Sequence, residues 1–150
     1  MTDYFALEPE VAGGLGPNTV MDTSNHPPVV SFLEYQFANW LGDELLESYP
    51  CYIVTRRLAD ALTEGQFEGL SFHALSVSVD PEFEDVTRID ELPTFLWMKV
   101  VGSAGRDDVG LSETGRLVVC QTALDVLRAF TLDHCDIDSP KAAEWQPPHL

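Results

Sequence analysis

Hydrophobic and polar residues alternate in several short stretches of the chain, as they do in half-buried strands. The clearest case is 33–37, where Leu33, Tyr35 and Phe37 would share one buried face. Glu34 would then point to the opposite face and lie in water. Similar patterns and short apolar runs predict further strands within 1–8, 75–79 and 95–100.

Two stretches combine an apolar strand with a helix that begins directly after it. Residues 51–54 are an apolar run, and Thr55 is placed to cap a helix over 56–64 whose apolar residues recur at helical spacing. The run 117–120 and a helix over 122–130 repeat this arrangement 65 residues later. The aligned units share a valine, an aspartate and a leucine, which fits both a duplicated building block and chance.

A third, shorter helix is expected near Trp40, where the sequence 40–47 reads as a turn leading into helix. This helix would face Leu45 and Leu46 toward the core. It would leave its acidic residues, Asp43, Glu44 and Glu47, in water.

These elements predict the fold class. Two or three helices and several strands joined by short turns indicate an α+β single domain over 1–138, with one mixed, mostly antiparallel sheet and the helices mainly on one side. The proline-rich tail over 139–150 carries little pattern, so we expect it to be loosely held.

Charge narrows the classes of partner. The 150 residues include 25 acidic and 8 basic ones, for a formal net charge of −17. Nucleic acids and anionic membranes are bound through lysine and arginine, so neither is an expected partner. The start of the chain lacks the basic and apolar pattern of an export signal, and three cysteines fit a reducing compartment, so we expect a soluble protein of the cytoplasm.

No residue pattern predicts catalysis, a metal or a cofactor. The compact groups of metal-ligand types, 134–138 and Asp107–Asp108, lack a recognised spacing. Cys51 and Cys120 lie in apolar runs, where a thiolate is disfavoured. Cys135 follows His134, but adjacent residues of a strand point to opposite faces and make a poor catalytic pair.

Clusters of acidic residues are the remaining candidate site. A solubilising loop is the simplest interpretation of any one of them. The alternative is a surface complementary to a basic protein, since opposite charge speeds association and salt screens it. The residues expected to face such a partner are Asp80, Glu82, Glu84, Asp85, Asp90, Glu91, Asp107 and Asp108.

The opening stretch 4–16, YFALEPEVAGGLG, resembles the start of a family of small bacterial immunity proteins, first described in myxobacteria as a domain of unknown function. The resemblance extends over about residues 4–138, and its motifs are turns and strands rather than catalytic residues. Further similar stretches are 40–47, 53–55 with Leu58, Leu92–Pro93 and 117–119.

Members of that family are the immunity partners of polymorphic and contact-dependent toxins. The resemblance therefore implies tight, non-catalytic binding of a cognate toxin domain, expected to be basic, in the cytoplasm of the producing cell. Two alternatives remain: a hydrolase whose site is assembled from residues distant in sequence, and a non-inhibitory regulatory domain that binds a ligand or peptide near Trp40.

Overall fold

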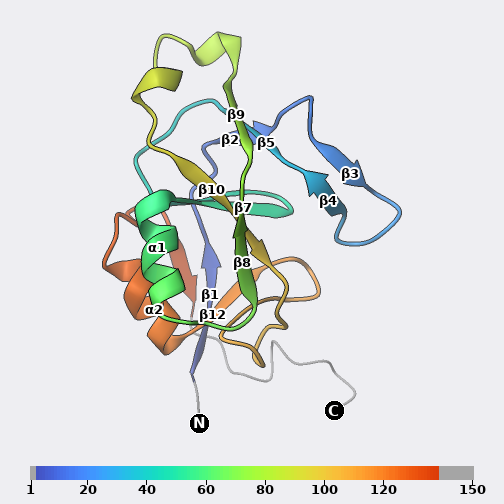
Figure 1. Cartoon of the computed structure of the whole chain (residues 1–150), viewed down its shortest axis with the longest axis vertical. Coiled ribbons are helices and arrows are strands. Elements are labelled where there is room, and N and C mark those ends of the chain that lie inside the picture. The colour runs from blue at the N-terminus through green and yellow to red at the C-terminus, as the bar shows by residue number, and fades with distance from the viewer. Residues whose placement is uncertain (1–2, 139–150) are drawn as a thin grey trace.

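Short strands and two α-helices make up residues 3–138, which are the part of the chain that this computed structural model describes (Figure 1). The tail predicted over 139–150 lies outside the described residues. All paired strands run antiparallel except β5 with β9, so the predicted α+β class is confirmed. The elements are β1 (Tyr4–Glu8), β2 (Gly13–Leu15), β3 (Val20–Asp22), β4 (Val29–Phe32), β5 (Glu34–Phe37), β6 (Leu45–Ser48), β7 (Cys51–Thr55), α1 (Arg56–Glu64), β8 (Leu70–His73), β9 (Ser76–Val79), β10 (Phe95–Val100), β11 (Val109–Leu111), β12 (Leu117–Cys120), α2 (Gln121–Arg128) and β13 (Asp136–Asp138), with short 3-10 turns η1 (Pro81–Phe83) and η2 (Ile89–Glu91).

The strands form four sheets rather than the single sheet that the sequence led us to expect. Their orders are β11-β12-β1-β13, β6-β7-β10-β8, β2-β5-β9 and β3-β4. The reason lies in β7, which is buried along its whole length. A strand that is apolar on both faces needs cover on both sides, which one sheet with helices on one side does not supply.

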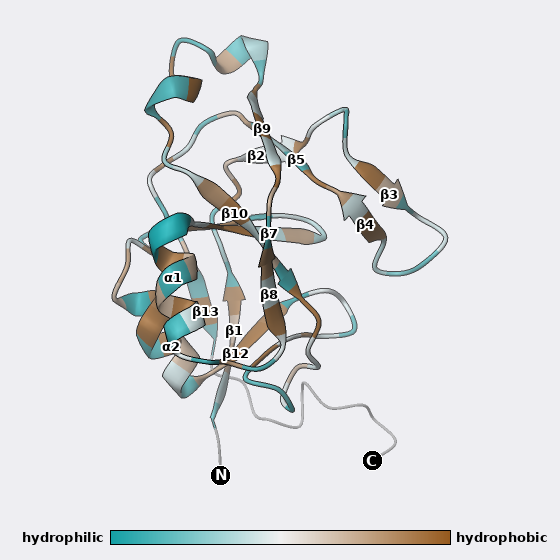
Figure 2. Cartoon of the chain, viewed as in Figure 1, coloured by the Kyte–Doolittle hydropathy of each residue, from teal (hydrophilic) through white to brown (hydrophobic). Residues whose placement is uncertain are grey.

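Alternate residues of β7 therefore enter two different cores. Tyr52 and Val54 pack into a core that both four-stranded sheets and both helices enclose. Cys51 and Ile53 pack into a second core beneath the β2-β5-β9 sheet, together with Trp97. In Figure 2 each helix carries both hydropathy colours, because α1 and α2 lie side by side and turn one apolar face to the first core.

The two strand-helix units are both present and share one topology. In each, a hairpin (β6–β7 or β11–β12) leads straight into a helix (α1 or α2), and the chain returns as a strand at the far edge of the same sheet (β8 or β13). An antiparallel strand, β10 or β1, fills the place between. The buried helix residues also correspond: Leu58, Ala59 and Leu62 in α1 lie 65 residues before Ala123, Leu124 and Leu127 in α2.

The strand registers keep the same offset of 65 residues. In one sheet Thr55 pairs with Phe95 and His73 with Trp97; in the other Cys120 pairs with Tyr4 and Asp138 with Ala6. A common register over two strands and a helix favours the duplicated building block over chance. Since β1 precedes the first unit but completes the second sheet, and β10 precedes the second unit but completes the first, the units have exchanged their central strands.

The helix boundaries follow the sequence closely. Helix α1 has the predicted bounds, and the Thr55 hydroxyl accepts a hydrogen bond from the Leu58 N–H as its cap. Helix α2 begins at Gln121 and ends at Arg128, so it starts one residue earlier and stops earlier than the 122–130 predicted. The chain beyond α2 tightens, because the N–H groups of Ala129 and Phe130 each bond the carbonyl three residues back.

Two predictions about acidic residues are wrong. Leu45 begins strand β6 instead of lying in a helix, and Asp43 and Glu44 before it are buried. Glu34 is also buried, although the strand and its apolar face of Leu33, Tyr35 and Phe37 are as predicted. Glu34 accepts hydrogen bonds from the Asn18 N–H and the Ser78 hydroxyl, and the bond from Ser78 lowers its pKa. These partners replace water around the carboxylate.

Candidate functional site

Residues 80–91 form an acidic projection at the upper end of the molecule in Figure 1, where η1 and η2 lie beyond β9. It carries most of the predicted site: Asp80, Glu82, Glu84, Asp85, Asp90 and Glu91. Its base is fixed to the fold, because the buried Thr87 donates from its hydroxyl to the Ala38 carbonyl at 2.6 Å. The structure thus gathers these six carboxylates on one anchored segment.

The acidic projection also exposes apolar side chains. Val86 is 67% exposed and Ile89 is 57% exposed. Among the acids, Asp80 caps η1 by accepting a hydrogen bond from the Glu82 N–H. Glu91 forms an ion pair with Arg88 at 3.7 Å, and both of these side chains are exposed. A cavity of about 510 Å³ separates part of the projection from β9. Apolar groups surrounded by like charges are a typical composition of a protein-binding surface.

Asp107 and Asp108 do not join the acidic projection. They lie in the loop before β11, in the lower half of Figure 1. The Asp107 carboxylate accepts from the Ser103 N–H at 2.7 Å, and that of Asp108 accepts from the Glu68 N–H at 2.8 Å. Both acids hold the fold together, so the eight predicted residues do not form one surface.

The buried pair Asp43–Glu44 is the counterpart of Asp107–Asp108 in the other unit. The Thr55 N–H bonds the Glu44 carbonyl, as the Cys120 N–H bonds the Asp108 carbonyl. Each second acid then reaches the segment that follows the other unit's helix: Glu44 accepts from the Thr131 N–H, and Asp108 from the Glu68 N–H. Each acid pair therefore connects its own unit to the other one by a hydrogen bond from the backbone of that other unit.

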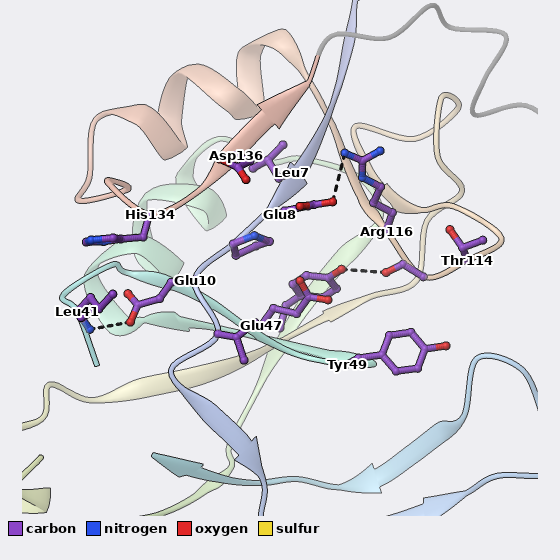
Figure 3. A pocket seen from close by; sticks show the side chains of 14 residues that line it. Leu7, Glu8, Glu10, Leu41, Glu47, Tyr49, Thr114, Arg116, His134 and Asp136 are labelled. Carbon is purple, nitrogen blue, oxygen red and sulfur yellow. Dashed lines mark hydrogen bonds and ion pairs between the residues drawn. The ribbon is translucent and has the colours of Figure 1, made fainter. Parts of the chain in front are cut away.

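A larger cavity that the sequence did not predict lies between the two units. This seam cavity has a volume of about 590 Å³ and opens between β1 and the turns of the two hairpins (Figure 3). Its polar lining includes four carboxylates, Glu8, Glu10, Glu47 and Asp136, with Arg116 and His134. Tyr49 and Tyr52 add aromatic surface, and the Tyr52 hydroxyl donates to the Gly115 carbonyl at 2.8 Å.

Glu8 and Glu47 of the seam cavity lie near enough for the charge of one to act on the other, and little positive charge in the lining compensates its four carboxylates. Burial raises the pKa of Glu47, and the charge of Glu8 raises it further. Burial also raises the pKa of Glu10, although hydrogen bonds from the backbone of Leu41 and Asp43 oppose that effect. Arg116 is already engaged, since its Nη2 donates to Asp138 and lies 3.7 Å from Glu8. The cavity therefore has an excess of negative charge.

Three residues in this region are of types that can bind a metal ion. Potential ligand atoms of Glu10, Asp43 and His134 all lie within 4.8 Å of one another. Both carboxylates are occupied, however: Glu10 accepts from the Leu41 and Asp43 N–H groups, and Asp43 accepts from the Asp133 and His134 N–H groups. The His134 ring bonds Asp43 at 3.1 Å, which raises the histidine pKa. This group fixes the chain after α2.

Two of the thiols are unsuited to nucleophilic chemistry. Burial raises the pKa of both Cys51 and Cys135 to about 12, so neither forms appreciable thiolate at neutral pH. His134 bonds Asp43 rather than the neighbouring Cys135. The two residues precede β13 rather than lying in a strand, so the opposite faces predicted for them do not apply.

A further cavity, of about 470 Å³, lies beside Trp40 and is lined in part by Glu44, Arg56 and Arg57. Burial alone would raise the pKa of Glu44, but hydrogen bonds from Arg57 and its neighbours lower it to about 2. Arg57 donates from Nη2 at 2.6 Å and leaves its own side chain mostly exposed. A cavity is therefore present near Trp40, where the alternative ligand site is expected, and Glu44 in its lining is ionised at neutral pH.

Comparisons with known proteins found no counterpart: no family model matches the chain, and neither the curated proteins nor the solved structures contain a match. Among the described residues, neither α1 nor α2 is long and apolar enough to cross a membrane. The functional argument therefore rests on the sites themselves.

Proposed function

We propose that this chain is an immunity protein, which binds a basic toxin domain in the cytoplasm of the producing cell and neutralises it without catalysing a reaction. The acidic projection carries this proposal. It places exposed Val86 and Ile89 among six carboxylates on a segment anchored at Thr87. Residues 1–138 are proposed to act as one domain, because both units contribute to a common core.

The two kinds of side chain on the acidic projection have different roles in this proposal. Carboxylates attract a basic partner and raise the association rate, an effect that salt screens. Val86 and Ile89 supply apolar surface that leaves water in the complex and slows dissociation. The overall charge of −17 reinforces the attraction but does not select a surface. The binding surface is instead selected by the position of the acidic projection.

Charge reversal on the acidic projection tests this assignment. The variant Glu82→Lys, Glu84→Lys, Asp85→Lys changes exposed carboxylates and spares Asp80, which caps η1. Its matched control, Asp60→Lys, Glu64→Lys, Asp125→Lys, makes the same change of charge on exposed positions of the two helices.

Both variants are assayed against the toxin domain encoded beside the gene, by stopped-flow association at low and high salt and by rescue of growth. We expect the projection variant to associate about 10-fold to 100-fold more slowly at low salt, with a flatter salt dependence, and the control to change little. Equal slowing of both variants would refute the surface assignment. If the unchanged protein neither binds nor rescues, the immunity proposal fails, and a ligand site beside Trp40 becomes the better candidate.

A further inference from the structure

The seam cavity has a counterpart related to it by the duplication. A smaller cavity of about 140 Å³ lies against the β6-β7-β10-β8 sheet, and Tyr52 lines both cavities. The strand registers make four lining positions equivalent. Leu7, Glu8, Glu47 and Arg116 of the seam cavity correspond to Met98, Lys99, Leu111 and Cys51 of the smaller one.

The smaller cavity is partly filled by the protein's own chain. Its wall includes the segment 27–30, Pro-Pro-Val-Val, which leads into β4. Val30 is only 6% exposed and packs with Cys51 and Trp97 in the second core. This segment belongs to the long insertion between β1 and β6, which the second unit does not have. Among residues 3–138, no such segment lines the seam cavity, which is about 590 Å³ in volume.

The lining of the two cavities differs in the chemistry that an occupant would meet. Where the filled cavity has Lys99 and Leu111, the seam cavity has Glu8 and Glu47. Glu10 and Asp136 add further carboxylates, while Arg116 is engaged by Asp138. A cationic side chain would relieve the repulsion between these acids. Apolar rim residues are also exposed, namely Val11, Leu41 and Tyr49.

We propose that the seam cavity binds an extended segment of a partner protein and takes up one of its arginine or lysine side chains among Glu8, Glu47 and Asp136. The residues on either side of that basic residue pack on Val11, Leu41 and Tyr49. The segment thus takes the place that residues 27–30 hold in the equivalent cavity. This site is separate from the acidic projection and does not depend on its role in toxin binding.

Short blocked peptides test the proposal with the full chain. The probe is acetyl-Val-Arg-Val-amide, with acetyl-Val-Gln-Val-amide as the uncharged control and arginine amide as a free cation. Binding is followed by amide shifts in two-dimensional NMR spectra of the nitrogen-15-labelled protein. We expect the arginine tripeptide to shift amides of the non-proline residues in 8–11, 47–52, 114–116 and 134–136. The glutamine tripeptide should bind at least about 10-fold more weakly, and arginine amide should also bind more weakly than the arginine tripeptide.

Matched variants locate the charge that matters. Glu47→Gln removes a carboxylate of the seam cavity, and we expect it to weaken binding of the arginine tripeptide about 10-fold, as loss of one charge-assisted hydrogen bond would. Glu8→Gln, at an exposed side chain, is the second variant should Glu47→Gln fold poorly. Glu82→Gln removes the same charge from the acidic projection and should leave binding unchanged.

The proposal would be overturned by equal binding of the arginine and glutamine tripeptides, by equal weakening by Glu47→Gln and Glu82→Gln, or by shifts outside the seam cavity. Arginine amide binding as tightly as the tripeptide would also overturn it, since the occupant would then be a small cation rather than a peptide segment. None of these results depends on a toxin, so they are distinguishable from failure of the immunity proposal.

Discussion

The acid pairs Asp43–Glu44 and Asp107–Asp108 hold equivalent places in the two units but are embedded differently. Both pairs precede the first strand of a hairpin, and both bond the segment beyond the other unit's helix. Asp43 and Glu44 are buried, whereas Asp107 and Asp108 are half-buried. Glu44 also has an arginine partner, Arg57. The two acid pairs therefore make equivalent hydrogen bonds to the backbone, but the pair in the first unit is more buried and has an additional ion pair.

The surroundings of each unit explain this difference. The outer face of β7 supports the second core, so the first unit is covered on both faces. The outer face of β12 contributes Val118 to a small cluster with Ala6 and Ala104. An acid pair in the first unit therefore lies deeper, where an unpaired carboxylate would be costly and full hydrogen bonding is needed.

Removing the deepest carboxylate should give the largest loss of stability. Asp43→Ala leaves the N–H groups of Asp133 and His134 without their acceptor in a partly buried setting. We expect the free energy of unfolding to fall by about 3 kcal/mol. Asp107→Ala, at the equivalent position, should cost about 1 kcal/mol because the Ser103 N–H that it exposes can bond water. Urea unfolding measures both, and equal losses would contradict the expectation that the more deeply buried acid contributes more to stability.

Neutralising Glu44 should have the next largest effect and a distinctive pH dependence. Glu44→Gln removes the partner of Arg57 and should lower the free energy of unfolding by about 2 kcal/mol at neutral pH. The folded-state pKa is lowered from the usual 4.5 to about 2, so the ionised carboxylate stabilises the fold above the unfolded value. That contribution is lost as pH falls from about 4.5 through 2.

Urea unfolding at several pH values checks this sign. The gap between the unchanged protein and Glu44→Gln should narrow steadily on acidification. Asp108→Asn is the matched variant in the second unit, where no arginine pairs with the acid among the described contacts. A gap that stayed constant down to pH 2 would mean that packing, not ionisation, accounts for the effect of Glu44.

Local pattern was sufficient for the elements whose structure depends on near neighbours. The cap at Thr55, the bounds of α1 and the shared face of Leu33, Tyr35 and Phe37 all follow from residues within a few positions. The offset of 65 residues was also visible, because it relates two local patterns. The strand exchange was not, since nothing in β1 or β10 indicates which hairpin each will join.

The acidic residues show where local pattern fails. The pattern predicts Asp43 and Glu44 in water because the N–H groups that bond them near Thr131 and His134 are about 90 residues away in sequence. Thr55 and Arg57, which also bond Glu44, are nearer but still beyond a local pattern. The pattern predicts Asp108 on a binding surface for the same reason, since its partner Glu68 is 40 residues away. The acidic projection differs, since its exposed carboxylates have no need of a distant partner. The seam cavity lies between units, so no single stretch of sequence reveals it.

The smallest predicted effect concerns the two helix caps. Thr55 caps α1 and also donates from its hydroxyl to Glu44, whereas Cys120 begins α2 without a side-chain cap. Thr55→Ala should lower the free energy of unfolding by about 1 kcal/mol. Cys120→Thr should raise it by about 0.5 kcal/mol, because a hydroxyl there can cap α2 and donate to Asp108 as Thr55 does to Glu44. Thermal unfolding of both variants measures the pair. If Cys120→Thr destabilises the protein, then the two units are equivalent in backbone but not in the side chain required at this position. The buried site of Cys120 would then require an apolar thiol rather than a hydroxyl.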